Sequence, residues 1–199
     1  MDVTLIGYGA GNIASVRFAL ERLGARVRIT DDPADVPEAE RVILPGVGAA
    51  GYAMKQLNAL GLTDALRAFE RPLLGVCLGQ QLLFEKSDED GGADMLGLIK
   101  GRVTPVVPGP SRPSPHMGWS RLHIRRDDPL MQGVEAGEWV YFVHSFACPD
   151  GAATVAYADY GQTIPAVVNS GNRWGCQFHP ERSAKTGARI LRNFLELPA

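Results

Sequence analysis

The chain has 199 residues, enough for one substantial α/β core and short for two. Hydrophobic residues make up 45% of it and charged residues 21%, which is typical of globular proteins. The formal net charge of −2 without a basic run argues against nucleic-acid binding, and no apolar window reaches the length of a membrane span.

The amino terminus reads as a strand entering a glycine turn, without the basic start and long apolar stretch of a signal peptide. The three cysteines, Cys77, Cys148 and Cys176, lack metal-type spacing and suit reduced thiols. We therefore expect a cytoplasmic protein with one domain over residues 1–199 and no metal or other cofactor.

The first half of the chain alternates strand and helix patterns. Apolar runs predict strands at 3–7, 25–30 and 41–44 and in the segment before Cys77. Helical stripes predict helices at 12–23, 52–60 and 64–69. This alternation indicates βαβ units, hence an α/β fold with a central, mostly parallel sheet flanked by helices.

The second half is rich in short strand patterns separated by Gly and Pro. Runs at 99–107, 119–125, 139–146, 153–157, 164–169 and 174–178 predict additional antiparallel strands. A proline-rich stretch at 105–115 predicts an extended surface loop. The last helix is expected at 184–195, with Ser183 as its N-cap.

The segment 72–84 carries the strongest chemical signal. An apolar run of strand length ends in Cys77, a helical pattern follows at once, and Gly75 and Gly79 leave room for a tight turn. A thiol there faces the positive end of a helix dipole, which favours the nucleophilic thiolate. Gly-x-Cys-x-Gly is the thiol counterpart of the Gly-x-Ser-x-Gly turn. A small buried cysteine at a strand–helix junction is the alternative.

His179 and Glu181 follow a second apolar strand, with a proline between them that holds His179 out of the helical region. A thiol that attacks a carbonyl needs a base, and the base needs a third group to orient it. Because the carboxyl ends of parallel strands meet at one edge of a sheet, Cys77, His179 and Glu181 are expected to converge there. A surface turn is the alternative for His179 and Glu181.

The segment Pro45-Gly-Val-Gly48 ends another strand, and its glycines allow backbone N–H groups to turn towards a ligand. Acyl transfer needs such donors for the developing oxyanion. The N–H of Leu78, next to the nucleophile, is the natural second donor. An ordinary Pro-Gly turn is the alternative.

Pro-Gly-Val-Gly, Gly-Val-Cys-Leu-Gly-Gln-Gln and Gly-Cys-Gln-Phe-His-Pro-Glu resemble, in order and spacing, the three signature blocks of class I (triad-type) glutamine amidotransferases. Within that family, Gly9-Ala-Gly-Asn12, Pro115-His-Met-Gly-Trp119 and Tyr141-Phe-Val-His-Ser145 look most similar to the glutaminase subunits of imidazole glycerol phosphate synthase, in histidine biosynthesis.

The resemblance implies a flavodoxin-like fold in which Cys77 attacks the side-chain amide of L-glutamine, forms a thioester and releases ammonia. His179 would transfer the protons and Glu181 would orient His179. The resemblance further implies an oxyanion hole at Val47, Gly48 and Leu78 and substrate-binding residues at Gly46, Gln81 and Ser145.

The same resemblance implies a heterodimer with a (β/α)₈-barrel cyclase that receives the ammonia through an internal channel. The docking face would comprise Asn12, Met117, Trp119, Tyr141 and Arg182. Two positions depart from the family pattern: Gln80 stands where methionine is usual, and Arg182 where lysine is frequent.

Other interpretations remain open at this point. Gly7-Tyr-Gly-Ala-Gly11 with Asp31 resembles a nicotinamide-binding fingerprint, but Asn12 stands where the third glycine belongs. A free-standing γ-glutamyl thiol hydrolase uses the same three groups as the glutaminase. A glutaminase subunit for vitamin B6 or anthranilate synthesis and a non-catalytic binding module of the same fold are further alternatives.

Overall fold

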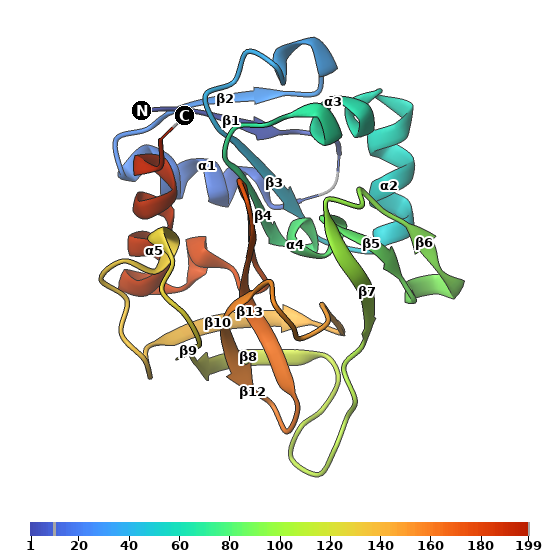
Figure 1. Ribbon diagram of the computed structural model, residues 1–199, viewed down its shortest axis with the longest axis vertical. Helices are drawn as coiled ribbons and strands as arrows, with labels where there is room; N and C mark the ends of the chain where they lie inside the picture. The colour runs from blue at the N-terminus through green and yellow to red at the C-terminus, as the bar shows by residue number, and fades with distance from the viewer. Residues whose placement is uncertain (10, 199) are drawn as a thin grey trace.

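An eight-stranded sheet forms the centre of the computed structural model, which describes residues 1–9 and 11–198 (Figure 1). The strand order is β2-β1-β3-β4-β14-β13-β12-β9. Its strands are β1 Asp2–Ile6, β2 Arg26–Thr30, β3 Val42–Gly46, β4 Leu73–Cys77, β9 His123–Ile124, β12 Thr154–Asp159, β13 Thr163–Ser170 and β14 Arg173–Cys176. The glycine turn expected after the first strand includes Ala10, which lies outside the described residues.

The sheet is parallel from β2 to β14 and antiparallel from β14 to β9. The predicted α/β fold, with a mostly parallel sheet and added antiparallel strands, is therefore confirmed. Because β14 runs parallel to β4, the segments that follow both strands leave the sheet at the same edge.

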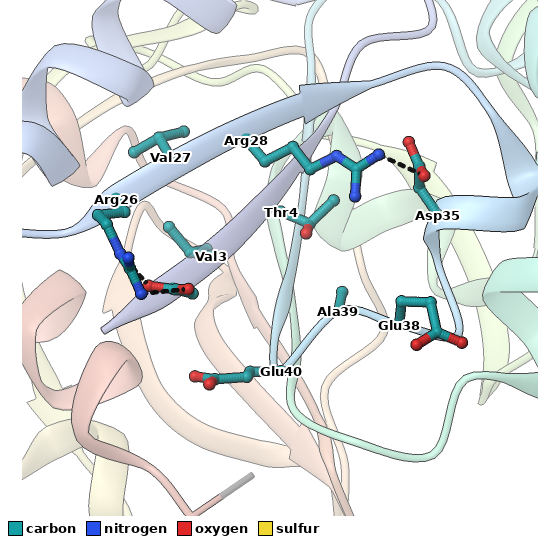
Figure 2. A pocket seen from close by; sticks show the side chains of 10 residues that line it. Val3, Thr4, Arg26, Val27, Arg28, Asp35, Glu38, Ala39 and Glu40 are labelled. Atoms are coloured by element: carbon teal, nitrogen blue, oxygen red, sulfur yellow. Dashed lines mark hydrogen bonds and ion pairs between the residues drawn. The ribbon is translucent and has the colours of Figure 1, made fainter.

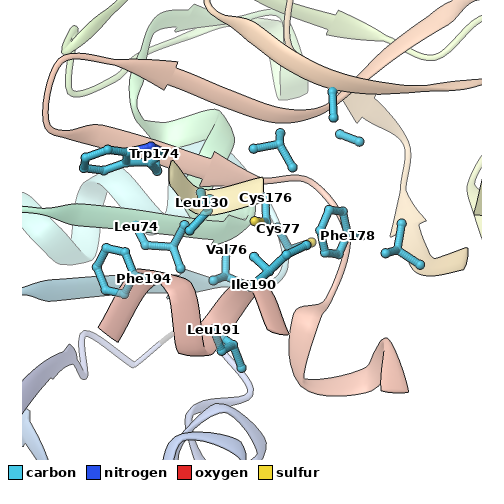
Figure 3. Packing of buried hydrophobic residues seen from close by; sticks show 14 of the residues in the cluster. Leu74, Val76, Cys77, Leu130, Trp174, Cys176, Phe178, Ile190, Leu191 and Phe194 are labelled. Carbon is cyan, nitrogen blue, oxygen red and sulfur yellow. The ribbon is translucent and has the colours of Figure 1, made fainter. Parts of the chain in front are cut away.

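Helices cover both faces of the sheet (Figure 1). The helices α1 Ile13–Arg22 and α5 Ala184–Glu196 share one buried cluster, and α2 Ala50–Ala59, α3 Leu62–Ala68 and α4 Leu78–Leu82 share the other. Figure 3 shows how Ile190, Leu191 and Phe194 of α5 pack over the strands that carry Leu74 and Trp174. Burial of these apolar side chains fixes the strands that lead to the site.

Two smaller sheets extend the second half. One has the order β11-β7-β5-β6, and the other pairs β8 with β10. Their bounds are β5 Phe84–Ser87, β6 Ala93–Asp94, β7 Ile99–Pro105, β8 His116–Arg121, β10 Trp139–His144 and β11 Phe146–Ala147. Single 3₁₀ turns lie at η1 Pro33–Asp35, η2 Glu89–Gly91, η3 Pro129–Met131 and η4 Pro180–Arg182.

The helix expected directly after Cys77 is present but short: it ends at Leu82, and the chain enters β5 at Phe84. One expectation from the sequence was wrong in detail. Ser183 stands at the N-cap position of α5, but its side chain makes no capping bond. Its Oγ instead donates to the carbonyl of His179 at 2.7 Å and accepts from the N–H of Tyr141 at 3.0 Å.

Within the described part of the chain, no helix combines the length and the apolar character needed to cross a membrane.

Candidate active site

Cys77 is the last residue of β4 and directly precedes α4. Its backbone has φ 56° and ψ −111°, a conformation that residues other than glycine seldom adopt. Such strain costs on the order of 1–3 kcal/mol and persists only where the surroundings enforce it. The sharp turn predicted for this thiol is therefore present, and the surrounding packing explains it.

Gly75 and Gly79 allow α4 to lie directly against the strands. A Cβ on Gly79 would stand 1.8 Å from the carbonyl oxygen of Leu44, and a Cβ on Gly75 would stand 2.3 Å from the carbonyl oxygen of Gly79. No rotamer change relieves a contact between a Cβ and the backbone. The two glycines around the cysteine are thus explained by close approach.

His179 and Glu181 follow β14 and lie at the same edge of the sheet as Cys77. The Nδ1 of His179 is 2.9 Å from Oε1 of Glu181, and both side chains are buried. His179 has φ −94° and ψ 97°, the extended conformation expected before Pro180. Since a carboxylate only accepts, Nδ1 carries the proton and Nε2 is left for another partner.

Cys77 and His179 line the same cavity, and Cys77 is the second side chain that acts on this imidazole. Burial alone lowers the pKa of His179, but hydrogen bonds to the side chains of Cys77 and Glu181, and the negative charges of both groups, raise it above its ordinary value. The sulfur of Cys77 also lies 3.8 Å from the carbonyl oxygen of Val143. The arrangement therefore favours a protonated imidazole beside the sulfur of Cys77 at the end of β4.

A cavity of about 310 Å³ opens at these side chains. Its lining includes the predicted site residues Val47, Gly48, Cys77, Leu78, Gln81, Ser145 and His179. Gly46 does not line the cavity: it pairs with Cys77 in the sheet, and a Cβ on it would stand 2.7 Å from the hydroxyl of Tyr8. The volume is near the lower end of the range for small-ligand sites.

Two polar residues of the lining, Glu89 and His144, escaped the sequence analysis. Glu89 accepts a bond from the N–H of Ala50 at 2.7 Å, and burial raises the pKa of its carboxyl group. Glu89 lies in the acidic stretch Asp88-Glu-Asp-Gly-Gly92, which carries no motif. The sequence therefore offered no signal for it.

The buried amide of Gln81 is already engaged on one side. Its Nε2 donates to the carbonyl oxygen of Phe146 at 2.8 Å and to Oε1 of Gln177 at 3.0 Å. The amide therefore presents Oε1 as its remaining polar atom.

Four of the five predicted docking residues cluster on the outer face of the β8–β10 pair. Trp119 and Tyr141 are register partners with their rings edge to face at 5.7 Å, and the Arg182 guanidinium lies 5.4 Å from the centre of the Tyr141 ring. Met117 is 61% exposed on the same strand as Trp119. Asn12 is exposed at the start of α1, where its Oδ1 accepts from the N–H of Ser15.

The other two thiols are fully buried away from the cavity lining. Burial raises the pKa of Cys148 to about 12 and raises that of Cys176 further. Neither is suited to act as a nucleophile at neutral pH. Among the described residues, no group of three or more His, Cys, Asp or Glu side chains is arranged to hold a metal ion.

A second cavity, of about 410 Å³, lies beside β1 and β2 at the far edge of the sheet (Figure 2). Its two arginines are each paired with an aspartate: Arg26 binds Asp2 at 2.7 Å, and Arg28 binds Asp35. No thiol or imidazole is among its lining residues. The chemistry therefore belongs to the cavity at Cys77.

A family model described as "Glutamine amidotransferase class-I" matches residues 4–197. The chain belongs to the class I glutamine amidotransferases. This assignment sets aside the nicotinamide-binding interpretation of the first glycine turn. It also confirms the resemblance to class I glutamine amidotransferases that the three sequence blocks showed.

Known amidotransferases resemble the chain over nearly its whole length. A protein of Xanthomonas axonopodis pv. citri named "Imidazole glycerol phosphate synthase subunit HisH" is 53% identical, with 98% of each chain covered. A protein of the same name from Xylella fastidiosa is 52% identical, covering 100% of this chain and 98% of its own. A crystal structure titled as a glutamine amidotransferase has a TM-score of 0.75 at 21% identity, covering 98% of this chain and 97% of its own. This structural likeness shows that the chain has the fold of that glutamine amidotransferase.

Proposed function

We propose that this chain is the glutaminase subunit of an imidazole glycerol phosphate synthase. In this role it hydrolyses L-glutamine to glutamate and ammonia and delivers the ammonia to a cyclase in histidine biosynthesis. The single observation that carries the proposal is the Glu181–His179–Cys77 series at the mouth of the 310 Å³ cavity. The two relatives above carry the name of this synthase's subunit.

The proposed reaction begins with the Cys77 proton on Nε2 of His179 and with attack of the resulting thiolate on the carboxamide carbon of glutamine. The C–N bond breaks, the Nε2 proton of His179 passes to the leaving nitrogen, and ammonia departs while a γ-glutamyl thioester forms. His179, now neutral, takes a proton from water, whose oxygen attacks the thioester. Glutamate leaves, and the proton returns to the sulfur–imidazole pair. The raised pKa of His179 supports its first step as an acid.

The oxyanion that forms in both steps needs N–H donors close to the sulfur. Leu78 supplies the N–H that follows the nucleophile, and Val47 and Gly48 supply the facing turn; all three line the cavity. Gly48 has φ 93°, which suits a glycine at that turn. We propose these three residues as the oxyanion hole.

The amino-acid part of glutamine carries an ammonium and a carboxylate group. Glu89 offers a carboxylate in the lining and Gln81 offers Oε1, so both suit the ammonium group. Ser145 is exposed in the lining and offers a hydroxyl to the carboxylate group. Gly46 acts indirectly, because its lack of a side chain leaves room for Tyr8 and Leu78 beneath the turn.

The proposed partner is a (β/α)₈-barrel cyclase, bound at a face formed by Asn12, Met117, Trp119, Tyr141 and Arg182. Exposed aromatic and arginine side chains are typical of interface centres. The N–H of His179 donates to the carbonyl of Tyr141 at 2.9 Å, so β10, which carries part of this face, is bonded directly to the backbone of His179. Arg182 keeps the charge of the lysine frequent in the family but not its geometry.

We further propose that residues 1–199 form one glutamine amidotransferase domain and that the protein works in the cytoplasm. The three free thiols suit a reducing compartment.

The test is ammonia release from glutamine by the purified chain, with and without the cyclase encoded beside it or in the same genome. Near-silent activity alone that rises steeply with this cyclase, and vanishes in Cys77→Ala, supports the proposal. Full activity without any partner would instead indicate a free-standing γ-glutamyl hydrolase. Stimulation by the partner of vitamin B6 or anthranilate synthesis, and not by the cyclase, would move the chain to that branch of the family.

A further inference from the structure

Two buried histidines that the proposed reaction does not use lie between the cavity and the outer face of β8. His116 and His144 are 2% and 6% exposed, and their rings are joined by a 2.9 Å contact from Nδ1 of His116 to Nε2 of His144. The ring of His116 is stacked between Phe142 and Tyr160, with centroid distances of 4.6 and 3.9 Å. Such rings have little freedom to turn.

The direction of every hydrogen bond in this group follows from one backbone carbonyl. The oxygen of Phe146 lies 2.8 Å from Nδ1 of His144, and since a carbonyl only accepts, Nδ1 carries the proton. His144 is neutral, because burial lowers its pKa to about 4, so its Nε2 accepts from His116. Burial also lowers the pKa of His116, to about 3.

The same logic extends the chain to the surface. Neutral His116 carries its one ring proton on Nδ1, where it donates to His144. Its Nε2 therefore accepts, and it lies 2.9 Å from the hydroxyl of Ser120, which donates. Ser120 is half-buried on β8 and lies on the same face of the strand as His116, whereas its sequence neighbours Trp119 and Arg121 are exposed on the opposite face. A one-way series of hydrogen bonds thus runs from Ser120 through both histidines to the Phe146 carbonyl.

At the cavity end, the Phe146 carbonyl also accepts from Nε2 of Gln81 at 2.8 Å. β11 lies at the edge of its sheet, so this carbonyl is served by side chains and not by a further strand. Its two lone pairs are therefore taken by His144 and Gln81. The second N–H of Gln81 goes to Gln177, which leaves Oε1 of Gln81 as the atom available to a ligand.

We propose that His116 and His144 are positioning residues for the glutamine pocket, which hold the Phe146 carbonyl and through it the amide orientation of Gln81. The proposal rests on the proposed glutaminase function of the chain. It predicts that the affinity for glutamine depends on strand β8, which carries Met117 and Trp119 on its outer side. Neither histidine touches the reacting atoms, so their loss changes substrate binding more than the chemical step.

The test compares KM and kcat for glutamine hydrolysis, measured with saturating cyclase partner, in three histidine variants. His116→Phe keeps the stacked ring and removes both hydrogen bonds, so we expect KM to rise about fivefold to tenfold with kcat within twofold of wild type. His116→Asn places an amide N–H where Nδ1 was and restores KM to within about twofold. His123→Phe is the matched control at an exposed histidine stacked on Tyr157, and it leaves both constants unchanged.

Urea unfolding identifies variants that fail to fold. If His116→Phe fails to fold, Ser120→Ala tests the proposal in its place, because it removes only the hydroxyl at the outer end of the hydrogen-bond series. For Ser120→Ala we expect KM to rise about twofold to threefold with kcat unchanged. A folded His116→Phe, or in its absence Ser120→Ala, with wild-type KM would overturn the inference. A loss confined to kcat, or a His116→Asn variant no better than His116→Phe, would do the same. If the wild-type chain with its partner hydrolyses no glutamine, the proposed function itself fails.

Discussion

At the residue scale, the nucleophile depends on two glycines that bring α4 against the sheet. Gly79→Ala would drive a Cβ into the carbonyl of Leu44, and we expect it to lower the free energy of unfolding by more than about 3 kcal/mol. Gly51→Ala is the control, because nothing lies within 4 Å of a Cβ there and the residue is inside α2; it should stabilise by about 0.5–1 kcal/mol. Urea unfolding measures both, and equal stabilities would contradict the close packing.

Glu181 acts on His179 by charge as well as by orientation. Glu181→Gln keeps an oxygen that accepts from Nδ1 but removes the negative charge, so the pKa of His179 should fall towards its ordinary value. We expect the NMR titration midpoint of His179 to move to lower pH and kcat to fall by about 10²-fold or more. Glu196→Gln, at an exposed position of α5, should change neither. An unchanged midpoint in Glu181→Gln would contradict this role.

The candidate catalytic residues could be proposed from the sequence because Cys77 ends a strand between two glycines and His179 follows another strand directly before a proline. Cys77 and His179 sit in motifs whose spacing is visible in the chain itself. Glu89 and the pair His116–His144 could not be found this way, because only tertiary packing brings Glu89 and His144 to the cavity and places His116 against His144. A lone histidine on a strand looks the same whether it faces solvent, a core or a ligand.

At the element scale, Ser183 ties the segment after β14 to β10. Its fully buried hydroxyl donates to the carbonyl of His179 and accepts from the N–H of Tyr141. Ser183→Ala therefore leaves the half-buried N–H of Tyr141 without this acceptor, whereas the His179 carbonyl keeps its bond from the N–H of Arg182 at 3.0 Å. We expect a loss of about 1–3 kcal/mol in the free energy of unfolding. Ser170→Ala, at the exposed end of β13, should stay within about 0.5 kcal/mol of wild type. Equal effects of the two substitutions on the free energy of unfolding in urea would show that these hydrogen bonds of Ser183 do not stabilise the fold.

The histidine pair between β8 and β10 makes stability depend on pH. The folded pKa values of His116 and His144, about 3 and about 4, lie below the ordinary value near 6.5, so the unfolded chain binds more protons in between. Stability from these groups is therefore full above about pH 6.5 and is lost as the pH falls, by up to about 1.4 kcal/mol per pH unit for each histidine. His116→Phe should flatten this dependence in urea unfolding at pH 7 and pH 5. The same slope in wild type and variant would refute it.

The regular elements of the first half were predicted well, because the helical stripe at 12–23 and the strand runs are long and periodic. β5 and β6 were missed, since Phe84–Ser87 and Ala93–Asp94 are too short for a pattern. The capping role of Ser183 was wrong for another reason: tertiary partners outcompeted the local bond. Local sequence therefore fixes element type better than the hydrogen bonds of single side chains.

At the scale of the whole molecule, the outer face of β8 and β10 leaves large side chains uncovered. Trp119 is 49% and Met117 61% exposed, while Tyr52 on α2 is 55% exposed far along the chain from this face. If the cyclase docks on β8 and β10, Trp119→Ala should weaken its binding by about tenfold or more, as truncation of an interface anchor does. Tyr52→Ala should leave the affinity unchanged. Isothermal titration of each variant with the cyclase measures this, and equal affinities would place the partner elsewhere.

The central claim is that the Cys77 sulfur breaks the amide of glutamine with His179 as its proton partner. Peptide mass spectrometry after acid quenching, with the chain turning over glutamine in the presence of the cyclase, tests it most directly. We predict a γ-glutamyl group on the peptide that contains Cys77, none on those with Cys148 or Cys176, and none anywhere in Cys77→Ala. A glutamyl adduct on another residue, or undiminished ammonia release by Cys77→Ala, would contradict the account.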